Sequence, residues 1–271
     1  MGADCSSGHL LVIGGAEDRP GGSGLLRTFA ELSGGAGARI VLITTASGAP
    51  EDSFARYSAA CARLGVPVVS ELRLASRQEA DDDRTVDELG RATGVFFTGG
   101  DQSRLRVLVG SRTNRSLRDR LAEGALVIAG TSAGATVLGE TMILGGSRGP
   151  DGDDATGSPP RTGPGLGLLP EVIVDMHFAQ RRRFPRLLAA VLRHPSHLGV
   201  GIDEDTAILV GPGRFDVLGS GAVTTVDARP AAAAGPAGEP DDPARHVRLH
   251  QLYRGDSFRL HQRSPADRSD E

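Results

Sequence analysis

The sequence contains no lysine, and every one of its 30 Lys+Arg residues is an arginine. This absence excludes three kinds of catalytic or binding chemistry. Ser-Lys dyads, P-loop lysines and Schiff-base intermediates all need an ε-amino group. A nucleophile in this chain therefore has to be activated by another kind of base.

Cysteine is also scarce, because only Cys5 and Cys61 occur. Two thiols cannot form a disulfide framework, so a reduced compartment and a cytoplasmic location are expected. Residues 1–8 lack a basic segment before an apolar run, which argues against a signal peptide. No apolar stretch reaches membrane-spanning length, and a net charge of -4 gives no bulk basic charge for nucleic acid. We expect neither a membrane nor a nucleic-acid partner.

What is present is an alternation of short apolar runs and longer helical patterns. Continuous apolar strands separated by helices are typical of a parallel sheet covered on both faces, so we expect a doubly wound, mainly parallel α/β fold. The chain is long enough for one large domain of this kind. Strands are predicted at 9–13, 39–44, 66–72, 94–98 and 125–129, and helices at 25–32, 52–64, 86–92, 102–109, 117–123 and 134–139.

The pattern changes after residue 144. Residues 145–167 are rich in Gly, Pro and Asp and predict a long surface loop. A strand at 172–175 and a helix at 181–193 follow, and then four short strands with tight connections predict an antiparallel C-terminal extension: 199–202, 206–210, 215–218 and 222–227. The expected organisation is an α/β domain over 1–228, an Ala/Pro/Gly linker over 229–245, a hairpin of the same domain over 246–261, and a disordered tail over 262–271.

Two matches to Gly-x-Ser-x-Gly occur, at residues 130–134 and 145–149. Ser147 enters a segment full of Pro and Asp with no helix after it. Ser132 follows a buried strand and precedes a helical start made of small residues. A strand–turn–helix elbow exposes a serine nucleophile and aims helix amides at a developing oxyanion. We therefore assign the nucleophile to Ser132.

A serine nucleophile needs a base, and the base needs an acid that orients it. Of the seven histidines, His177 is the one that directly follows a strand and opens an arginine-rich segment. Open α/β sheets place their sites at such carboxyl ends. Three acids, at 203–205, also follow a strand. His246 and His250 lack a nearby third ligand, so we expect no metal, and we expect no cofactor.

Five blocks of the sequence together resemble the cyanophycinase family of serine peptidases, which also includes aspartyl dipeptidases. They occur in the family's order and span about residues 9 to 228. The blocks are residues 14–19, 97–102, 130–135, 175–178 with Arg181, Arg183 and Arg186 after them, and 201–207.

The resemblance implies a fold related to class I glutamine amidotransferases. It also implies a triad in the chain order Ser132, His177, Glu204, with an oxyanion hole near the amides of Gly100 and Ala133. Glu204 is favoured over its two neighbours because adjacent residues at a strand end point to opposite sides. In this family order the base precedes the acid, unlike the order in α/β-hydrolases.

The family's substrate is cyanophycin, a poly-aspartate backbone with arginine on each β-carboxyl, from which β-Asp-Arg dipeptides are released. The resemblance therefore implies a peptide partner containing Asp and Arg, and we expect a homodimer. Arginine forks suit a substrate carboxylate and acidic side chains suit a guanidinium. The predicted substrate-binding residues are Gln102, Asp175, Met176, Arg181 and Arg183, with Glu17 or Asp101 facing the guanidinium.

One departure from the family pattern concerns Met176, which stands where the family has glutamine. A thioether is only a weak acceptor, so reduced activity on cyanophycin is expected, with Met176→Gln raising it.

An aspartyl dipeptidase or a peptidase of secondary metabolism is the alternative on the same scaffold. A Rossmann-type nucleotide binder fits less well, because Arg27 stands where the third glycine belongs. A catalytically inactive binding protein is the remaining alternative, and the presence of all three triad residue types argues against it.

Overall fold

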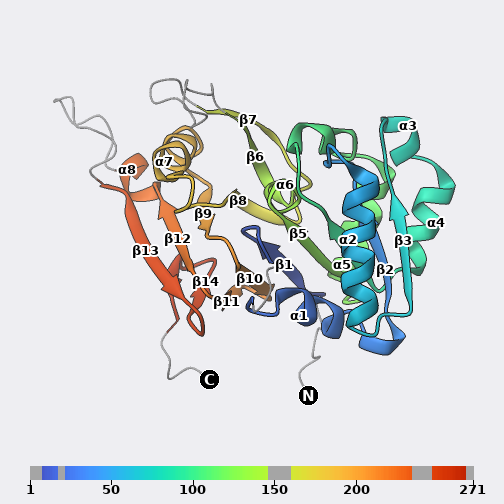
Figure 1. The fold of residues 1–271 in the computed structure, drawn as a ribbon. Helices are drawn as coiled ribbons and strands as arrows, with labels where there is room; N and C mark the ends of the chain where they lie inside the picture. Colours follow the sequence, from blue (N-terminus) through green and yellow to red (C-terminus); the bar gives the residue numbers. More distant parts are fainter. Residues whose placement is uncertain (1–7, 18–21, 146–159, 234–245, 267–271) are drawn as a thin grey trace, which may run out of the picture.

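The computed structural model describes residues 8–17, 22–145, 160–233 and 246–266. These residues form two sheets that lie side by side with helices packed against them (Figure 1). The first sheet has nine strands and the second has six. Within the described residues, no helix is both long and apolar enough to cross a membrane.

The first sheet begins as the predicted parallel array. Its strands run in the spatial order β1, β5, β4, β2, β3, and every pair among them is parallel. Their bounds are β1 (Leu10–Ile13), β2 (Arg39–Ile43), β3 (Val68–Leu72), β4 (Gly94–Phe97) and β5 (Val127–Thr131). Four of these strands are apolar runs and are almost entirely buried. The parallel strands predicted from the sequence are thereby confirmed.

Helices cover both faces of this parallel array, as a doubly wound fold requires. Alternate residues of β1 belong to different apolar clusters, because successive side chains of a strand point to opposite faces. One face packs against α1 (Leu25–Leu32) and α2 (Pro50–Arg63). The other face packs against α3 (Arg77–Ala80), α4 (Asp83–Arg91) and α5 (Arg112–Ala122).

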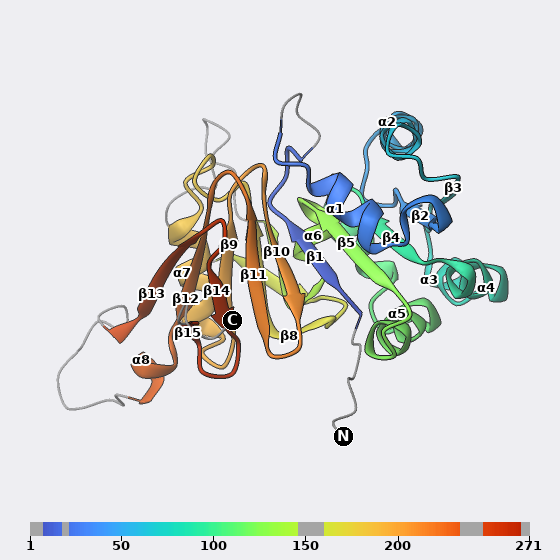
Figure 2. The same ribbon diagram turned by 90° about the horizontal axis from the view of Figure 1, so that it is seen from below.

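The first sheet then continues on the other side of β1 with antiparallel strands. Figure 2 shows β10 and β11 extending the sheet beside β1. The added strands are β10 (Thr206–Gly211), β11 (Arg214–Gly219), β14 (Ser257–Arg259) and β15 (Ser264–Pro265). The predicted antiparallel extension is present here.

A second sheet was not expected. Its spatial order is β13, β12, β9, β8, β6, β7, and α7 (Phe184–Arg193) packs on one of its faces. The strands are β6 (Gly139–Gly145), β7 (Arg161–Pro164), β8 (Leu169–Met176), β9 (Leu198–Ile202), β12 (Ala222–Asp227) and β13 (Arg248–Tyr253). Only β6–β8 and β8–β9 are parallel pairs. The prediction of a single, mainly parallel sheet was therefore incomplete, because local patterns identify strands but not their partners.

Several local predictions also need correction. The helix expected over 134–139 stops early, since α6 covers Ala133–Thr136 and β6 begins at Gly139. The prediction of a hairpin over 246–261 is wrong: β13 pairs with β12 in the second sheet, whereas β14 pairs with β11 in the first. The expected linker starts with a short helix, α8 (Arg229–Ala233), and its remaining residues lie outside the described part.

The segment expected to be a disordered tail is also partly structured. Residues 262–266 are described, and Arg263 is buried, with its Nη1 donating to Asp227 Oδ1 at 2.7 Å. This buried ion pair holds the end of the chain against the second sheet. Residues 267–271 lie outside the described part, as does most of the loop predicted over 145–167.

Candidate active site

Ser132 lies between the end of β5 and the start of α6, in the predicted elbow. Its backbone has φ 52° and ψ -115°, a conformation that costs a residue other than glycine free energy and is typical of strained functional sites. The neighbouring glycines allow this turn to close. A Cβ at Gly130 would lie 2.3 Å from the carbonyl oxygen of Gly134, and a Cβ at Gly134 would lie 2.2 Å from that of Phe97.

His177 follows β8 in the second sheet and reaches Ser132 in the first. Its Nε2 lies 3.0 Å from Ser132 Oγ. The ring packs directly on the backbone after β1, where a Cβ at Gly15 would lie only 2.3 Å from His177 Cε1. Glycine is thus required at position 15 for the ring to occupy this place, a role that sequence reasoning did not assign.

Glu204 follows β9 and contacts the other ring nitrogen of His177. Its Oε1 lies 2.8 Å from Nδ1, so the contact predicted for Glu204 is present. The adjacent acids point elsewhere: the Asp203 carboxylate accepts hydrogen bonds from two backbone amides, and the Asp205 carboxylate accepts from two serine hydroxyls. The amide of Glu204 donates to Gln180 Oε1 at 3.1 Å, which fixes the backbone of the acid. Nothing in the sequence pattern signalled Gln180.

The environment of His177 favours its neutral form. Burial lowers the pKa of the imidazole, its hydrogen bond to the Glu204 carboxylate raises it, and the nearby positive charge of Arg181 lowers it again, with a net decrease. A neutral ring that donates from Nδ1 to Glu204 presents Nε2 as a proton acceptor toward Ser132. The three side chains therefore form a continuous chain from hydroxyl to base to carboxylate, as nucleophilic catalysis requires.

The two predicted oxyanion-hole residues border Ser132. Ala133 is the first residue of α6, so its amide follows the serine directly. Gly100 belongs to the turn after β4, and the adjacent Gly99 lies against the serine, since a Cβ there would be 3.3 Å from Ser132 Cβ. Gly100 has φ +141°, and a Cβ at this position would collide with the Ala46 carbonyl. The turn after β4 can thus pack against Ala46 only with glycine at position 100.

Two predicted pocket residues lie at the start of the next segment, η2 (Gln102–Val107): Gln102 is its first residue and Asp101 is its N-cap. Gln102 Nε2 donates to the Ile143 carbonyl at 2.8 Å and so connects η2 to the second sheet. Asp101 is exposed and caps η2 by accepting from the Ser103 amide at 2.8 Å. Hydrogen bonding with the Ser103 side chain is the main cause that lowers the pKa of Asp101, and the bond from the Ser103 amide lowers it further. An exposed carboxylate at this position stays available to a cation.

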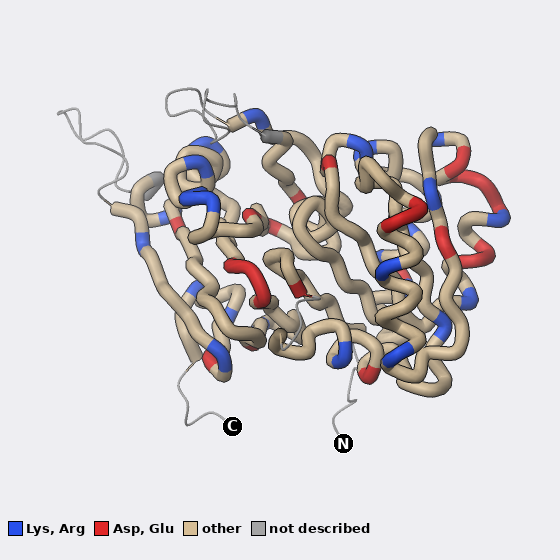
Figure 3. The backbone as a smooth tube through the Cα atoms, in the orientation of Figure 1, with Lys and Arg blue, Asp and Glu red and all other residues tan. Residues whose placement is uncertain are grey.

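Asp175 and Met176 are buried beneath an arginine cluster. Arg186 Nε donates to Asp175 Oδ2 at 2.7 Å, and Arg183 Nη1 donates to the Met176 carbonyl at 2.7 Å. The same Nη1 lies 2.6 Å from Met176 Sδ. The buried pair therefore holds the arginines in place, whereas Arg181 is exposed at the surface. Figure 3 shows basic residues gathered around α7 and the segment before it.

Glu17 was predicted to bind the substrate guanidinium, but its side chain lies in the interior of the protein. It is buried, and its two oxygens accept hydrogen bonds from Tyr57 Oη at 2.5 Å and Thr131 Oγ1 at 2.6 Å. The turn at Ala16, with φ 58°, directs the side chain inward. Because both oxygens are engaged inside the protein, this position does not support the predicted role as a ligand for a substrate guanidinium.

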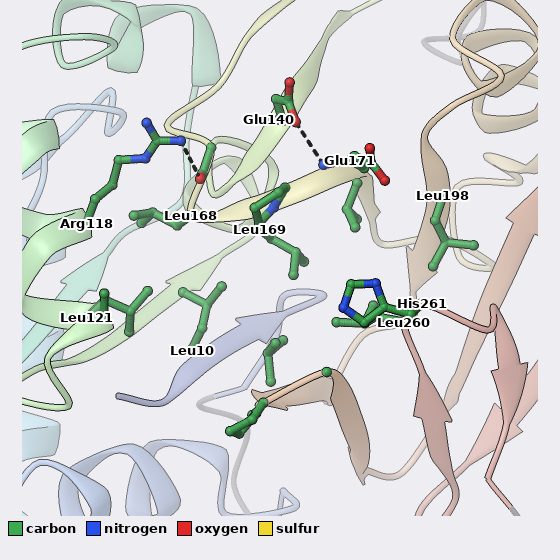
Figure 4. A pocket seen from close by; sticks show the side chains of 18 of the residues that line it. Leu10, Arg118, Leu121, Glu140, Leu168, Leu169, Glu171, Leu198, Leu260 and His261 are labelled. Carbon is green, nitrogen blue, oxygen red and sulfur yellow. Dashed lines mark hydrogen bonds between the residues drawn. The ribbon is translucent and has the colours of Figure 1, made fainter. Parts of the chain in front are cut away.

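A cavity of about 960 Å³ lies away from these residues (Figure 4). It is lined at the amino ends of β1, β8 and β9 and by the β10–β11 turn, with Arg118 and His261 among its polar residues. Ser132, His177 and Glu204 follow the carboxyl ends of their strands and are not among its lining residues. In the described part of the chain, no group of three or more His, Cys, Asp and Glu side chains is placed to hold a metal ion.

The chain is similar to known peptidases in sequence and in fold. The model of peptidase family S51 matches residues 10–218. A cyanophycinase from Nostoc sp. (strain PCC 7120 / SAG 25.82 / UTEX 2576) is 42% identical over 261 residues, covering 94% of this chain and 86% of the relative. A cyanophycinase from Thermosynechococcus vestitus (strain NIES-2133 / IAM M-273 / BP-1) is 40% identical over 266 residues, covering 94% of this chain and 80% of the relative.

Two solved structures share the fold at lower sequence identity. A peptidase from an acI-B1 actinobacterium has a TM-score of 0.67 and 24% identity, covering 93% of this chain and 97% of that one. A putative peptidase E from Listeria monocytogenes EGD-e has a TM-score of 0.55 and 19% identity, covering 79% of this chain and 98% of that one. At these identities the likeness concerns the fold alone.

Proposed function

This chain belongs to peptidase family S51 and is a serine-type peptidase, and we propose that it hydrolyses cyanophycin through Ser132, His177 and Glu204. The observation that carries the proposal is the unbroken chain of contacts on a strained elbow: 3.0 Å from Ser132 Oγ to His177 Nε2, and 2.8 Å from His177 Nδ1 to Glu204 Oε1. The substrate in this proposal, cyanophycin, is inferred from the names of the relatives.

In the proposed acylation step, Ser132 Oγ attacks the scissile carbonyl while His177 Nε2 takes the hydroxyl proton. The Glu204 carboxylate stabilises the imidazolium that forms. The amides of Gly100 and Ala133 donate to the oxyanion of the tetrahedral intermediate. When the C–N bond breaks, His177 returns the proton to the leaving amine. Water then attacks the acyl-enzyme by the same route in reverse.

Substrate selection in this proposal depends on charge. The exposed guanidinium of Arg181 binds a free carboxylate of the substrate, and Arg183, held by Asp175, presents a second guanidinium beside it. The exposed Asp101 binds the substrate guanidinium. Glu17 is not included, because its carboxylate is engaged in the interior.

A cleavage assay on purified cyanophycin tests the proposal. Wild-type protein is expected to release β-Asp-Arg, identified by mass spectrometry, and Ser132→Ala is expected to lower the rate by on the order of 10⁴-fold or more. Labelling with a serine-directed fluorophosphonate is expected to modify Ser132 and not Ser147. Hydrolysis of α-aspartyl dipeptides with no release of β-Asp-Arg from cyanophycin would instead identify an aspartyl dipeptidase, and a label on Ser147 would reject the assigned nucleophile.

The relation to class I glutamine amidotransferases is part of the same proposal, supported by a doubly wound parallel array that carries the nucleophile after β5. The expected homodimer and cytoplasmic location stay predictions. Light scattering on the purified protein and fractionation of the source cells would test them.

A further inference from the structure

The backbone loop after β1 contacts the base and the turn that carries the acid. The amide of His177 donates to the Gly14 carbonyl at 2.9 Å, and the amide of Asp205, directly after Glu204, donates to the Gly15 carbonyl at 2.7 Å. Two segments of the second sheet are thus fixed to one loop of the first sheet. A contact from this loop to the elbow that carries Ser132 would connect all three parts of the triad.

Glu17, at the end of this loop, makes that contact. Its Oε2 accepts from the hydroxyl of Thr131, the residue directly before Ser132, at 2.6 Å. Its Oε1 accepts from Tyr57 on α2 at 2.5 Å. All three side chains of this hydrogen-bonded group are buried, with relative exposures of 5% for Glu17, 2% for Thr131 and 3% for Tyr57.

Tyr57 is itself held in the core. Its ring packs on that of Phe96 with 4.8 Å between centroids, within the apolar cluster that α1 and α2 form on the sheet. The carboxylate of Glu17 is therefore fixed from one side by the core and holds the end of β5 from the other. Low surrounding polarity strengthens such hydrogen bonds and makes their loss costly.

We propose that Glu17 is a positioning residue that holds Thr131, and through it Ser132, in the conformation needed for attack. Ser132 has φ 52°, and a residue other than glycine keeps such a conformation only where its surroundings fix it. Glu17 touches no reacting atom in this proposal; it acts through the backbone of the elbow. The inference rests on the proposed function, because it takes Ser132 as the nucleophile.

Thr131→Val tests this directly, because it removes the hydroxyl and keeps the shape of the side chain. We expect kcat on cyanophycin to fall by about 10- to 100-fold, with KM changed by less than about threefold, because small misplacements of a nucleophile cost rate more than binding. Thr131→Ser keeps the hydroxyl and is expected to restore kcat to within about threefold of wild type.

Thr113→Val is the matched control for a loss of stability alone. Thr113 is also buried, and its hydroxyl donates to one acceptor, the Ala80 carbonyl at 2.7 Å, at the start of α5. We expect Thr113→Val to lower the melting temperature, as Thr131→Val does, and to leave kcat unchanged. A fall in kcat for both variants in proportion to their stability would overturn a positioning role.

Fluorophosphonate labelling separates this inference from the proposed function, because it reports the reactivity of Ser132 without cyanophycin. We expect slower labelling of Thr131→Val and of Glu17→Gln. We also expect the double variant to be no slower than the worse single variant, because both changes remove one interaction. If wild type and Thr131→Val are labelled at the same rate, the inference is overturned but the proposed function is not. If wild type is not labelled at all, the proposed function is overturned as well.

Discussion

The first sheet contributes Ser132 from the end of β5, whereas the second sheet contributes His177 from the end of β8 and Glu204 after β9. The surroundings of the two contributions differ. The residues around Ser132 are small and tightly packed, and Cβ atoms added at the neighbouring glycines would collide with the backbone. Around His177 the chain is charged, with a buried carboxylate at Asp175 that pairs with arginines.

This difference indicates that the two halves of the site are controlled by different physical effects. The position of the proposed nucleophile, Ser132, depends on steric fit, and the protonation state of the proposed base, His177, depends on burial and nearby charge. Their alignment depends on a third region, the loop after β1, which both sheets contact. Substitutions within one half should therefore be distinguishable from substitutions at the junction.

The largest effect is expected within the second sheet. Glu204→Gln keeps the size of the side chain but removes the charge that stabilises the imidazolium and selects the ring tautomer. We expect kcat to fall by roughly 10³- to 10⁴-fold with little change in stability. Glu140→Gln is the control, since Glu140 is exposed and accepts one backbone hydrogen bond away from the triad. A loss of less than tenfold in Glu204→Gln would reject Glu204 as the orienting acid.

A smaller effect is expected at the junction. Gly15→Ala places a methyl group against the His177 ring and should push the base away from Ser132, lowering kcat by about 100-fold. Gly34→Ala is its control, because Gly34 has the same φ of +109° but no atom within 3.4 Å of an added Cβ. Both variants should lose about 1 kcal/mol of stability from backbone strain. Equal kcat values in the two variants would mean that the close approach at Gly15 has no part in alignment.

Met176→Gln concerns only the second sheet and should have a smaller effect still. The structure places the Met176 sulfur against Arg183, so a glutamine oxygen there would accept a stronger hydrogen bond from that guanidinium. The added hydrogen bond is worth about 1 kcal/mol and would hold the guanidinium that we propose binds substrate, so we expect KM for cyanophycin to fall about two- to fivefold. A small activated ester should be hydrolysed equally by both forms. If the ester rate also changed, the substitution would be acting on the triad.

The smallest effect is a shift in the pH profile. His177 must be neutral to accept the serine proton, and burial lowers its pKa below the usual value of 6.5. The midpoint of the decline in kcat/KM for an activated ester should therefore lie below pH 6.5. Arg181→Gln removes a positive charge that lowers this pKa, so the decline should move toward pH 6.5. A midpoint above pH 6.5 in wild type would contradict this account of the base.

Much of the site could be predicted from the sequence because its elements are local. Continuous apolar runs marked β1, β2, β4 and β5 as buried strands, and the small residues around Ser132 separated it from Ser147. His177 and Glu204 each follow a strand, where open α/β sheets collect their functional groups. The family resemblance singled out Glu204 among residues 203–205, and the alternation of side chains explains why its two neighbours point elsewhere.

The remaining features depend on contacts between distant segments. Periodicity shows that β9 and β10 are strands, but not that the turn between them crosses from one sheet to the other. The orientation of Glu17 depends on the positive φ at Ala16, which is not a glycine and gave no signal. The C-terminal strands were assigned to a hairpin because neighbours in sequence usually pair, whereas here β13 and β14 belong to different sheets.

The pairing of β1 with β10 also affects the time at which a new chain becomes active. Leu10 pairs with Val210, so the first strand to be synthesised lacks this neighbour until 200 further residues have been made. At about 5–20 residues per second this delay is roughly 10 to 40 s. The link between the two sheets that runs from β9 into β10 cannot pair with β1 before then, although Ser132 and His177 already exist. Nascent chains arrested before β10 should therefore not react with a serine-directed label, whereas chains released at full length should.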